Sequence, residues 1–114
     1  MDLVNRFAVL LIPKRPYIEW ANSFGDGVTI SEGEAREHAT AFLVPDFEMV
    51  DDVHEFLAAN AAYIFEEALW AWVTDESTWP AKRDYWSLRD WFEIEIHEPL
   101  IDLSDEPIRV ERDV

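Results

Sequence analysis

Cysteine is absent from this sequence of 114 residues. Its absence excludes disulfide bonds, zinc sites with thiolate ligands, iron–sulfur clusters and a cysteine nucleophile. Long apolar runs are also missing: the run near the N-terminus covers only residues 7–12, whereas about 18 apolar residues are needed to cross a bilayer. Asp2 precedes this run and no cleavage site of small residues follows it, which is not typical of a signal peptide. We expect a cytoplasmic protein without membrane contacts.

Basic residues are scarce. Nine Lys and Arg residues stand against 25 Asp and Glu residues, and the formal net charge is -16. Such a charge creates a negative field that repels nucleic acid and attracts basic proteins. Two basic residues stand next to each other in the sequence in only two places, Lys14 with Arg15 and Lys82 with Arg83. We therefore predict a basic protein partner and no nucleic-acid ligand.

Apolar and aromatic residues are abundant despite this charge. They make up 49% and 14% of the chain, and six of them are tryptophans. A disordered acidic tail would be poor in aromatic residues, so the composition predicts a folded domain with a negative surface. The length fits a single domain over residues 1–114, in which we expect the polar segment 105–114 to be a frayed tail.

Three segments have the pattern of β-strands. The continuous apolar run of residues 6–12 is typical of a central strand buried on both faces, and residues 40–44 indicate a second strand. Residues 91–97 alternate between apolar and polar side chains, and their polar face consists of Glu93, Glu95 and His97. Pro99 indicates that this last strand lies at an edge of the sheet or contains a bulge.

Several short helices are predicted between these strands. Pro16 suits the first turn of a helix, and the glycine-rich residues 25–27 would end it in a turn. Ser31 and a glutamate three residues later have the spacing of a capping box, which predicts a helix over residues 32–38. Asp84 can cap another short helix before the last strand.

The strongest periodic pattern predicts one long helix over residues 50–73. Its stripe repeats every three or four residues over about five turns and consists of Val53, Phe56, Leu57, Asn60, Ala61, Ile64, Phe65, Ala68, Leu69 and Trp72. Tyr63 and Trp70 lie away from this stripe. We therefore expect the helix to be apolar on more than one face and to pack on both the sheet and another helix.

This order of strands and helices predicts an α+β fold. We expect a two-layer sandwich, in which a three- to four-stranded sheet carries helices mainly on one face. Because the last strand alternates between apolar and polar residues, the other face of the sheet should meet water.

Recognised catalytic and metal-binding motifs are absent. No serine stands in a G-x-S-x-G sequence, and the chain contains neither an H-E-x-x-H motif nor a phosphate-binding loop. Asp51, His54 and His97 could form a metal site only if the fold joins distant elements, and a solvated histidine near a helix start is the simpler interpretation. We predict no cofactor, no metal and no catalytic residue.

Four tryptophans are difficult to place in one small core: Trp70, Trp79, Trp86 and Trp91. One interpretation is an exposed cluster that binds a partner, because tryptophan is enriched at binding hot spots. The other is that the loop around Trp79 folds back and its indole plugs the core, an interpretation that we favour slightly. Pro80 restricts the backbone at Trp79 and suits either role.

The segment from Thr74 to Pro80 reads T-D-E-S-T-W-P, and a W-F-E-I-E-I-H strand follows it. In these motifs the chain resembles small acidic bacterial proteins of uncharacterised function, which share T-D-E-S-x-W-P after a long helix and W-F-x-[IV]-E-I-H after a short one. The N-R-F-A-V and P-K-x-P segments near the N-terminus are similar too. The resemblance covers most of the chain and implies a bacterial cytosolic single domain, but no particular activity.

Two functions are compatible with the sequence. The first is a non-enzymatic interaction module, monomeric or homodimeric, that binds a basic protein, as immunity proteins and nucleic-acid mimics do. Its expected contact residues are Asp75, Glu76, Trp79, Glu93, Glu95 and His97. The second is a small hydrolase or metal-dependent enzyme that uses Asp75, Glu76 and His97. We favour the first, because no nucleophile or complete ligand set accompanies the second.

Overall fold

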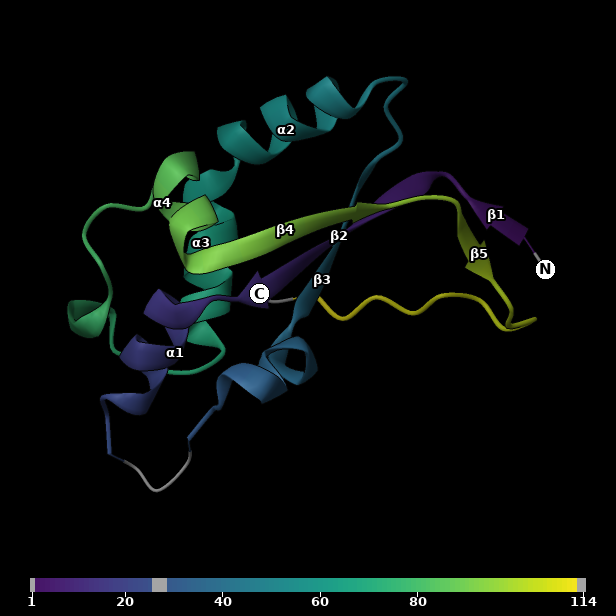
Figure 1. Ribbon diagram of the computed structural model, residues 1–114. Coiled ribbons are helices and arrows are strands. Elements are labelled where there is room, and N and C mark those ends of the chain that lie inside the picture. The colour runs from purple at the N-terminus through teal and green to yellow at the C-terminus, as the bar shows by residue number, and fades with distance from the viewer. Residues whose placement is uncertain (1, 26–28, 113–114) are drawn as a thin grey trace.

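The computed structural model describes residues 2–25 and 29–112 (Figure 1). Residues 26 and 27 of the predicted glycine turn lie outside this range. Three strands form an antiparallel sheet in the order β3-β2-β4, and two more form a separate antiparallel ribbon. The strands are β1 (Asp2–Val4), β2 (Arg6–Pro13), β3 (Thr40–Pro45), β4 (Phe92–His97) and β5 (Leu100–Asp102). The α-helices are α1 (Arg15–Asn22), α2 (Val50–Ala59), α3 (Ala61–Trp70) and α4 (Tyr85–Trp91), and the 3₁₀ helices are η1 (Glu32–His38) and η2 (Glu76–Thr78).

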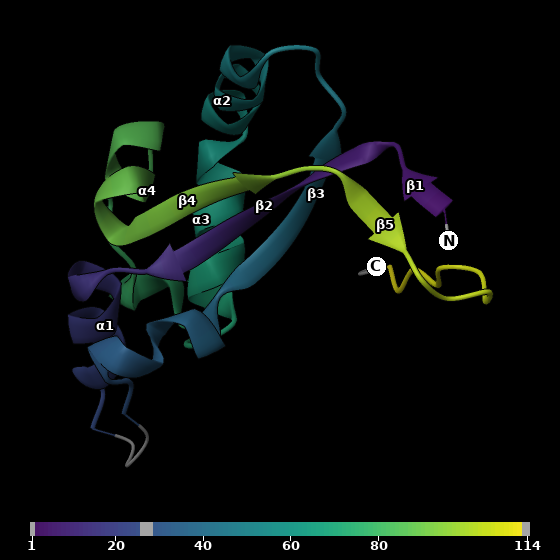
Figure 2. The same cartoon turned by 45° about the vertical axis from the view of Figure 1, so that its right-hand side comes forward.

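One face of the three-stranded sheet carries the core. Val9 in the central strand β2 lies opposite Phe42 of β3 and Ile96 of β4. Residues that lie directly opposite one another point to the same face of a sheet. Helix α3 lies behind this sheet in Figures 1 and 2, and Val9 is completely buried. The predicted α+β architecture, with helices mainly on one sheet face, is therefore confirmed.

The opposite face of the sheet is only partly covered. Leu43 of β3 is 58% exposed, while Ala8 and Leu10 of β2 are half-buried. Ile12 alone among the outward residues of β2 is fully buried, because η1 packs against that end of the strand. The prediction that residues 6–12 are buried on both faces is thus correct only near Ile12.

The β1–β5 ribbon is absent from the sequence-based prediction. It pairs Leu3 with Ile101, and it extends away from the helices in Figure 2. Strands of three residues are too short for an alternating pattern to stand out in the sequence. Pro99 lies between β4 and β5, and β4 is an edge strand, as predicted. Residues 105–112 contain no helix or strand and are exposed.

The predicted long helix over residues 50–73 is wrong in two respects, because it is interrupted at Asn60 and ends at Trp70. Asn60 has φ -113° and ψ 14°, and its side-chain Nδ2 donates a hydrogen bond to the carbonyl of Phe56 at 2.8 Å. Asparagine side chains compete in this way with the backbone for helical hydrogen bonds. The chain therefore changes direction between α2 and α3, although the apolar stripe continues across the break and stays buried.

The caps of the short helices differ from one another. The Asp84 carboxylate accepts a hydrogen bond from the backbone N–H of Ser87 at 2.8 Å and caps α4, as predicted. Ser31, in contrast, donates its hydroxyl to the Glu34 carboxylate at 2.7 Å and makes no side-chain bond to the backbone of η1. The predicted capping box is therefore wrong in its hydrogen bonds, and the predicted helix is a 3₁₀ helix.

The buried residues form one continuous cluster, to which the sheet and all four α-helices contribute. Its centre is Phe65 of α3, whose ring centroid lies 5.4 Å from that of Trp91 and 5.8 Å from that of Phe92. Tyr17 of α1 joins this cluster and donates its hydroxyl to the carbonyl of Ala68 at 3.2 Å. Burial raises the pKa of Tyr17 to about 12. The core therefore ties α1, α3 and α4 to the first residue of β4.

Candidate functional site

Two indole N–H groups fix the loop after α3, one from within the loop and one from α1. Nε1 of Trp79 donates a hydrogen bond to the carbonyl of Val73, and Nε1 of Trp20 donates one to the carbonyl of Thr78, both at 2.9 Å. Trp79 is half-buried and packs against the core. The loop thus has a defined position, and Trp79 makes the contacts expected of a plug.

Asp75 uses its carboxylate to shape this loop. The carboxylate accepts hydrogen bonds from the hydroxyl of Ser77 at 2.7 Å and from the backbone N–H of Ser77 at 3.0 Å. These hydrogen bonds, that of the hydroxyl first, lower the pKa of Asp75. Asp75 therefore caps η2, and the next residue, Glu76, is exposed on the first turn of this helix.

The outer face of α3 carries two aromatic residues with two glutamates between them. Tyr63, Glu66, Glu67 and Trp70 follow the spacing i, i+3, i+4 and i+7, which places them on one side of a helix. Tyr63 is 64% exposed and Trp70 is 55% exposed. The prediction that these two residues pack on another helix is therefore wrong, since their face of α3 is open to solvent.

The loop and the outer face of α3 together form a shallow pocket of about 230 Å³. We call it the α3 pocket; it is lined by Tyr63, Glu66, Glu67, Trp70, Glu76 and Trp79. Nη2 of Arg83 lies 3.6 Å from Oε1 of Glu66 and partly neutralises it. Within the described residues, Glu67 and Glu76 form no ion pair. The pocket therefore combines three aromatic rings with an excess of negative charge.

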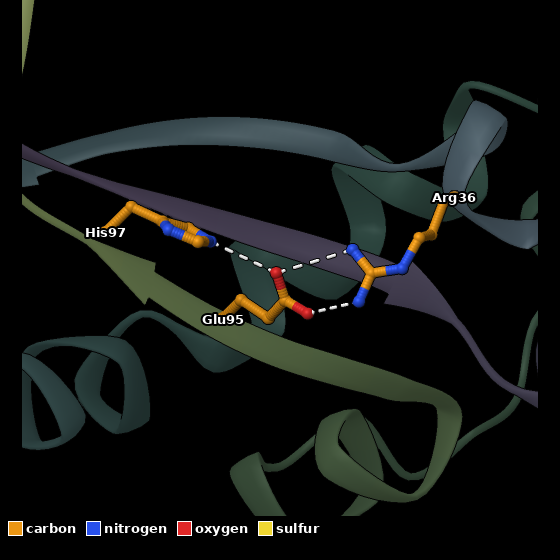
Figure 3. A network of polar contacts seen from close by, with 3 residues as sticks. All are labelled: Arg36, Glu95 and His97. Atoms are coloured by element: carbon orange, nitrogen blue, oxygen red, sulfur yellow. Dashed lines mark hydrogen bonds and ion pairs between the residues drawn. The ribbon is translucent and has the colours of Figure 1, made fainter.

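A second group of predicted residues lies on the outward face of β4 (Figure 3). Both guanidinium Nη atoms of Arg36, from η1, donate hydrogen bonds to the Glu95 carboxylate, and Nε2 of His97 lies 3.1 Å from Oε1 of the same carboxylate. The hydrogen bond from Arg36 first, and that from His97 next, lower the pKa of Glu95. Glu95 is thus neutralised within the chain, and Glu93 beside it is exposed.

The two groups do not form one surface. The turn at residues 76–78 lies at the far left of Figure 1, whereas β4 runs from the helices towards the right, and His97 is its last residue. Asp75 and Glu76 are therefore not brought together with His97. No group of three or more His, Asp or Glu residues in the described chain is arranged to hold a metal ion. His54 instead lies 2.7 Å from the Tyr85 hydroxyl through its Nδ1.

The four tryptophans considered as one exposed cluster lie in different places in the structure. Trp91 packs in the core against Phe65, and Trp86 is 73% exposed on α4. Only Trp70 and Trp79 line a common pocket. The sequence-based candidates omit Tyr63, Glu66 and Glu67, although the helical spacing of Tyr63 and Trp70 with two glutamates between them was a signal for a solvent-exposed face.

Comparisons with known proteins identify no relative: no family model matches the chain, and neither the curated proteins nor the solved structures contain a significant match. Among the described residues, no helix is both long enough and apolar enough to cross a membrane.

The Glu95 network gives a first testable prediction. Replacing Arg36 with glutamine should raise the pKa of Glu95, because the hydrogen bond from Arg36 is the main cause of its lowered value. A carboxyl whose pKa is lower in the folded state stabilises the fold above its unfolded pKa, and this stabilisation is lost as the pH falls through the folded pKa. The melting temperature of Arg36→Gln should therefore lie below that of the wild type at neutral pH, and the two should converge in acid.

NMR titration of the side-chain carboxyl carbons measures this pKa directly. Arg109→Gln is the matched control, because it removes the same charge from the exposed C-terminal segment. An unchanged Glu95 pKa in Arg36→Gln, or an equal shift in both variants, would show that the local ion pair does not set the pKa.

Proposed function

We propose that this protein is a non-enzymatic interaction module that binds a basic protein partner through the α3 pocket. The observation that supports the proposal is the meeting of three aromatic residues and three glutamates in one solvent-open pocket. Asp75 stands at the edge of the same loop and positions Glu76. The outward face of β4, with Glu93, Glu95 and His97, is a separate acidic surface and is not required for this contact.

Aromatic rings and carboxylates recognise cations in complementary ways. A lysine ammonium or an arginine guanidinium is attracted to the face of a tryptophan or tyrosine ring within about 6 Å of its centroid. Carboxylates beside the rings add charge-assisted hydrogen bonds to the same cation. Trp70 and Tyr63 are exposed enough to contact a partner, and Glu67 and Glu76 are free of ion pairs within the described residues.

The charge of the whole chain supports the same partner chemistry. A formal net charge of -16 attracts basic proteins over long distances and accelerates their association, most strongly at low ionic strength. It repels nucleic acid and other acidic proteins. The long-range field would bring a basic partner to the protein, and the α3 pocket would fix its orientation.

Affinity capture from the lysate of the native host, followed by calorimetry with the purified partner, tests the proposal. The wild type should retain a basic protein near physiological ionic strength. Trp70→Ala should weaken its binding about tenfold or more, as substitutions at interface hot spots do. Glu76→Gln should weaken binding less, mainly through slower association, and the difference should shrink at high salt.

Two matched controls separate the pocket from the general charge. Glu93→Gln removes the same charge from β4, and Trp86→Ala removes an exposed indole from α4. Both should bind the partner like the wild type. If Trp70→Ala and Glu76→Gln retain the partner as well as these controls do, or if the captured protein is acidic, the α3 pocket is not the binding site proposed here.

A further inference from the structure

A second pocket has the opposite charge to the rest of the molecule. It has a volume of about 390 Å³, which lies within the range of about 300–1,000 Å³ common for small-molecule sites. We call it the basic pocket; it is lined by Lys14, His54, Arg89, Phe92, Glu93 and Ile94. Only one of these six side chains is acidic, in a chain that has 25 acidic and nine basic residues.

The two cations of this pocket are not neutralised by carboxylates. Arg15, Arg36, Lys82 and Arg83 each lie within 4.0 Å of a carboxylate oxygen. Within the described part of the chain, Lys14 and Arg89 form no such ion pair. Arg6, Arg109 and Arg112 also lack one among the described residues, but Lys14 and Arg89 line the same pocket and bring two such cations together.

Local contacts hold these cations in place. Nζ of Lys14 donates a hydrogen bond to the carbonyl of Arg89 at 3.0 Å. The Arg89 guanidinium lies 5.6 Å from the ring centroid of Tyr85 and 5.9 Å from that of Trp86. Stacking on aromatic rings restrains a guanidinium and leaves its N–H groups in the ring plane able to bind an acceptor. Little side-chain entropy would then be lost when an anion binds.

His54 adds an oriented polar group. Its Nδ1 lies 2.7 Å from the hydroxyl of Tyr85, and burial raises the pKa of this hydroxyl. This contact fixes the orientation of the imidazole ring and leaves Nε2 as its second polar atom.

We propose that the basic pocket binds a small organic anion. Its carboxylate or phosphate group contacts Lys14 and Arg89, and its apolar part packs against the half-buried Ile94. Arginine and lysine bind such oxyanions through charge-assisted hydrogen bonds, and small-molecule sites combine such polar groups with apolar surface. This proposal is independent of the α3 pocket, since the two pockets have no lining residue in common.

Three probes test the proposal with the intact protein in NMR titrations. Benzoate carries a carboxylate on an apolar ring, phenyl phosphate carries a phosphate on the same ring, and inorganic phosphate has no apolar part. We expect benzoate or phenyl phosphate to shift the side-chain signals of His54 and Arg89 saturably at millimolar concentrations. The stronger of the two identifies the head group, and inorganic phosphate should bind about tenfold more weakly because it lacks the apolar contact.

Variants decide whether the two cations hold the anion. Arg89→Gln and Lys14→Gln should each weaken binding about tenfold, the loss expected for one charge-assisted hydrogen bond. Arg109→Gln removes an equal charge outside the pocket and should leave affinity unchanged. Circular dichroism checks folding, and the exposed Lys14 provides a second variant if Arg89→Gln disturbs α4. The proposal is overturned if no probe gives a saturable shift, or if Arg109→Gln weakens binding as much as the pocket variants.

Discussion

Replacing Phe65 with alanine is expected to lower the free energy of unfolding by about 3–5 kcal/mol, the range found for large aromatic residues in protein cores. Phe65 is completely buried, and its ring packs against Trp91 and Phe92. These contacts join α3 to the end of α4 and the start of β4. Their loss leaves a cavity at the point where the helices meet the sheet, and urea denaturation measures the cost.

Tyr63→Ala is the matched control, because it removes an aromatic ring from the outer face of the same helix. Tyr63 is 64% exposed, so the change in unfolding free energy should stay within about 0.5 kcal/mol. A loss smaller than about 1 kcal/mol for Phe65→Ala, or equal losses for both variants, would contradict the assignment of the inner and outer faces of α3.

Those two faces show how far the sequence predicts this fold. The inner stripe repeats at helical spacing over many residues, so both its helical conformation and its burial could be predicted. The interruption at Asn60 could not be predicted from that pattern, because the stripe stays in phase across it. The interruption depends on one side-chain hydrogen bond to Phe56, and a polar residue within an apolar stripe was its only sign.

The sheet shows the same limit. The apolar run of β2 and the alternation of β4 predict strands and even the central position of β2, because each pattern is local. The partial cover of the outward sheet face by η1 depends on contacts between residues that are distant in the sequence. Arg36 of η1, for example, is 59 positions away from its partner Glu95. Neither residue carries a local signal for the other. The charge network in Figure 3 therefore cannot be predicted from local sequence patterns and is visible only in the three-dimensional structure.

The candidate site was predicted in part for a related reason. Glu76 and Trp79 were identifiable because they stand close together in an unusual loop, and they do line one pocket. Combining them with Glu93, Glu95 and His97 assumed that the loop and the last strand meet, and the structure places them apart. Sequence patterns predict which residues share an element, but the packing of elements decides which residues share a surface.

Trp79→Ala is expected to cost about 3 kcal/mol of stability, near the lower end of the range for large aromatic truncations. The indole is half-buried, packs against the core and donates a hydrogen bond to the carbonyl of Val73. Removing it exposes the C-terminal end of α3 and releases the loop that carries Glu76. Trp79→Phe should retain most of the packing and cost about 1 kcal/mol, the usual value of one lost hydrogen bond.

The effects of Trp79→Ala and Trp70→Ala on stability and on partner binding should differ. Trp70 is 55% exposed, so Trp70→Ala should leave the free energy of unfolding within about 0.5 kcal/mol of the wild type while weakening partner binding. Trp79→Ala should reduce both stability and binding, because Trp79 is at once a plug over the core and a wall of the α3 pocket. Denaturant unfolding and calorimetry on the same two variants provide the comparison. An unchanged melting temperature for Trp79→Ala would exclude the plug, and unchanged binding by both variants would exclude the pocket.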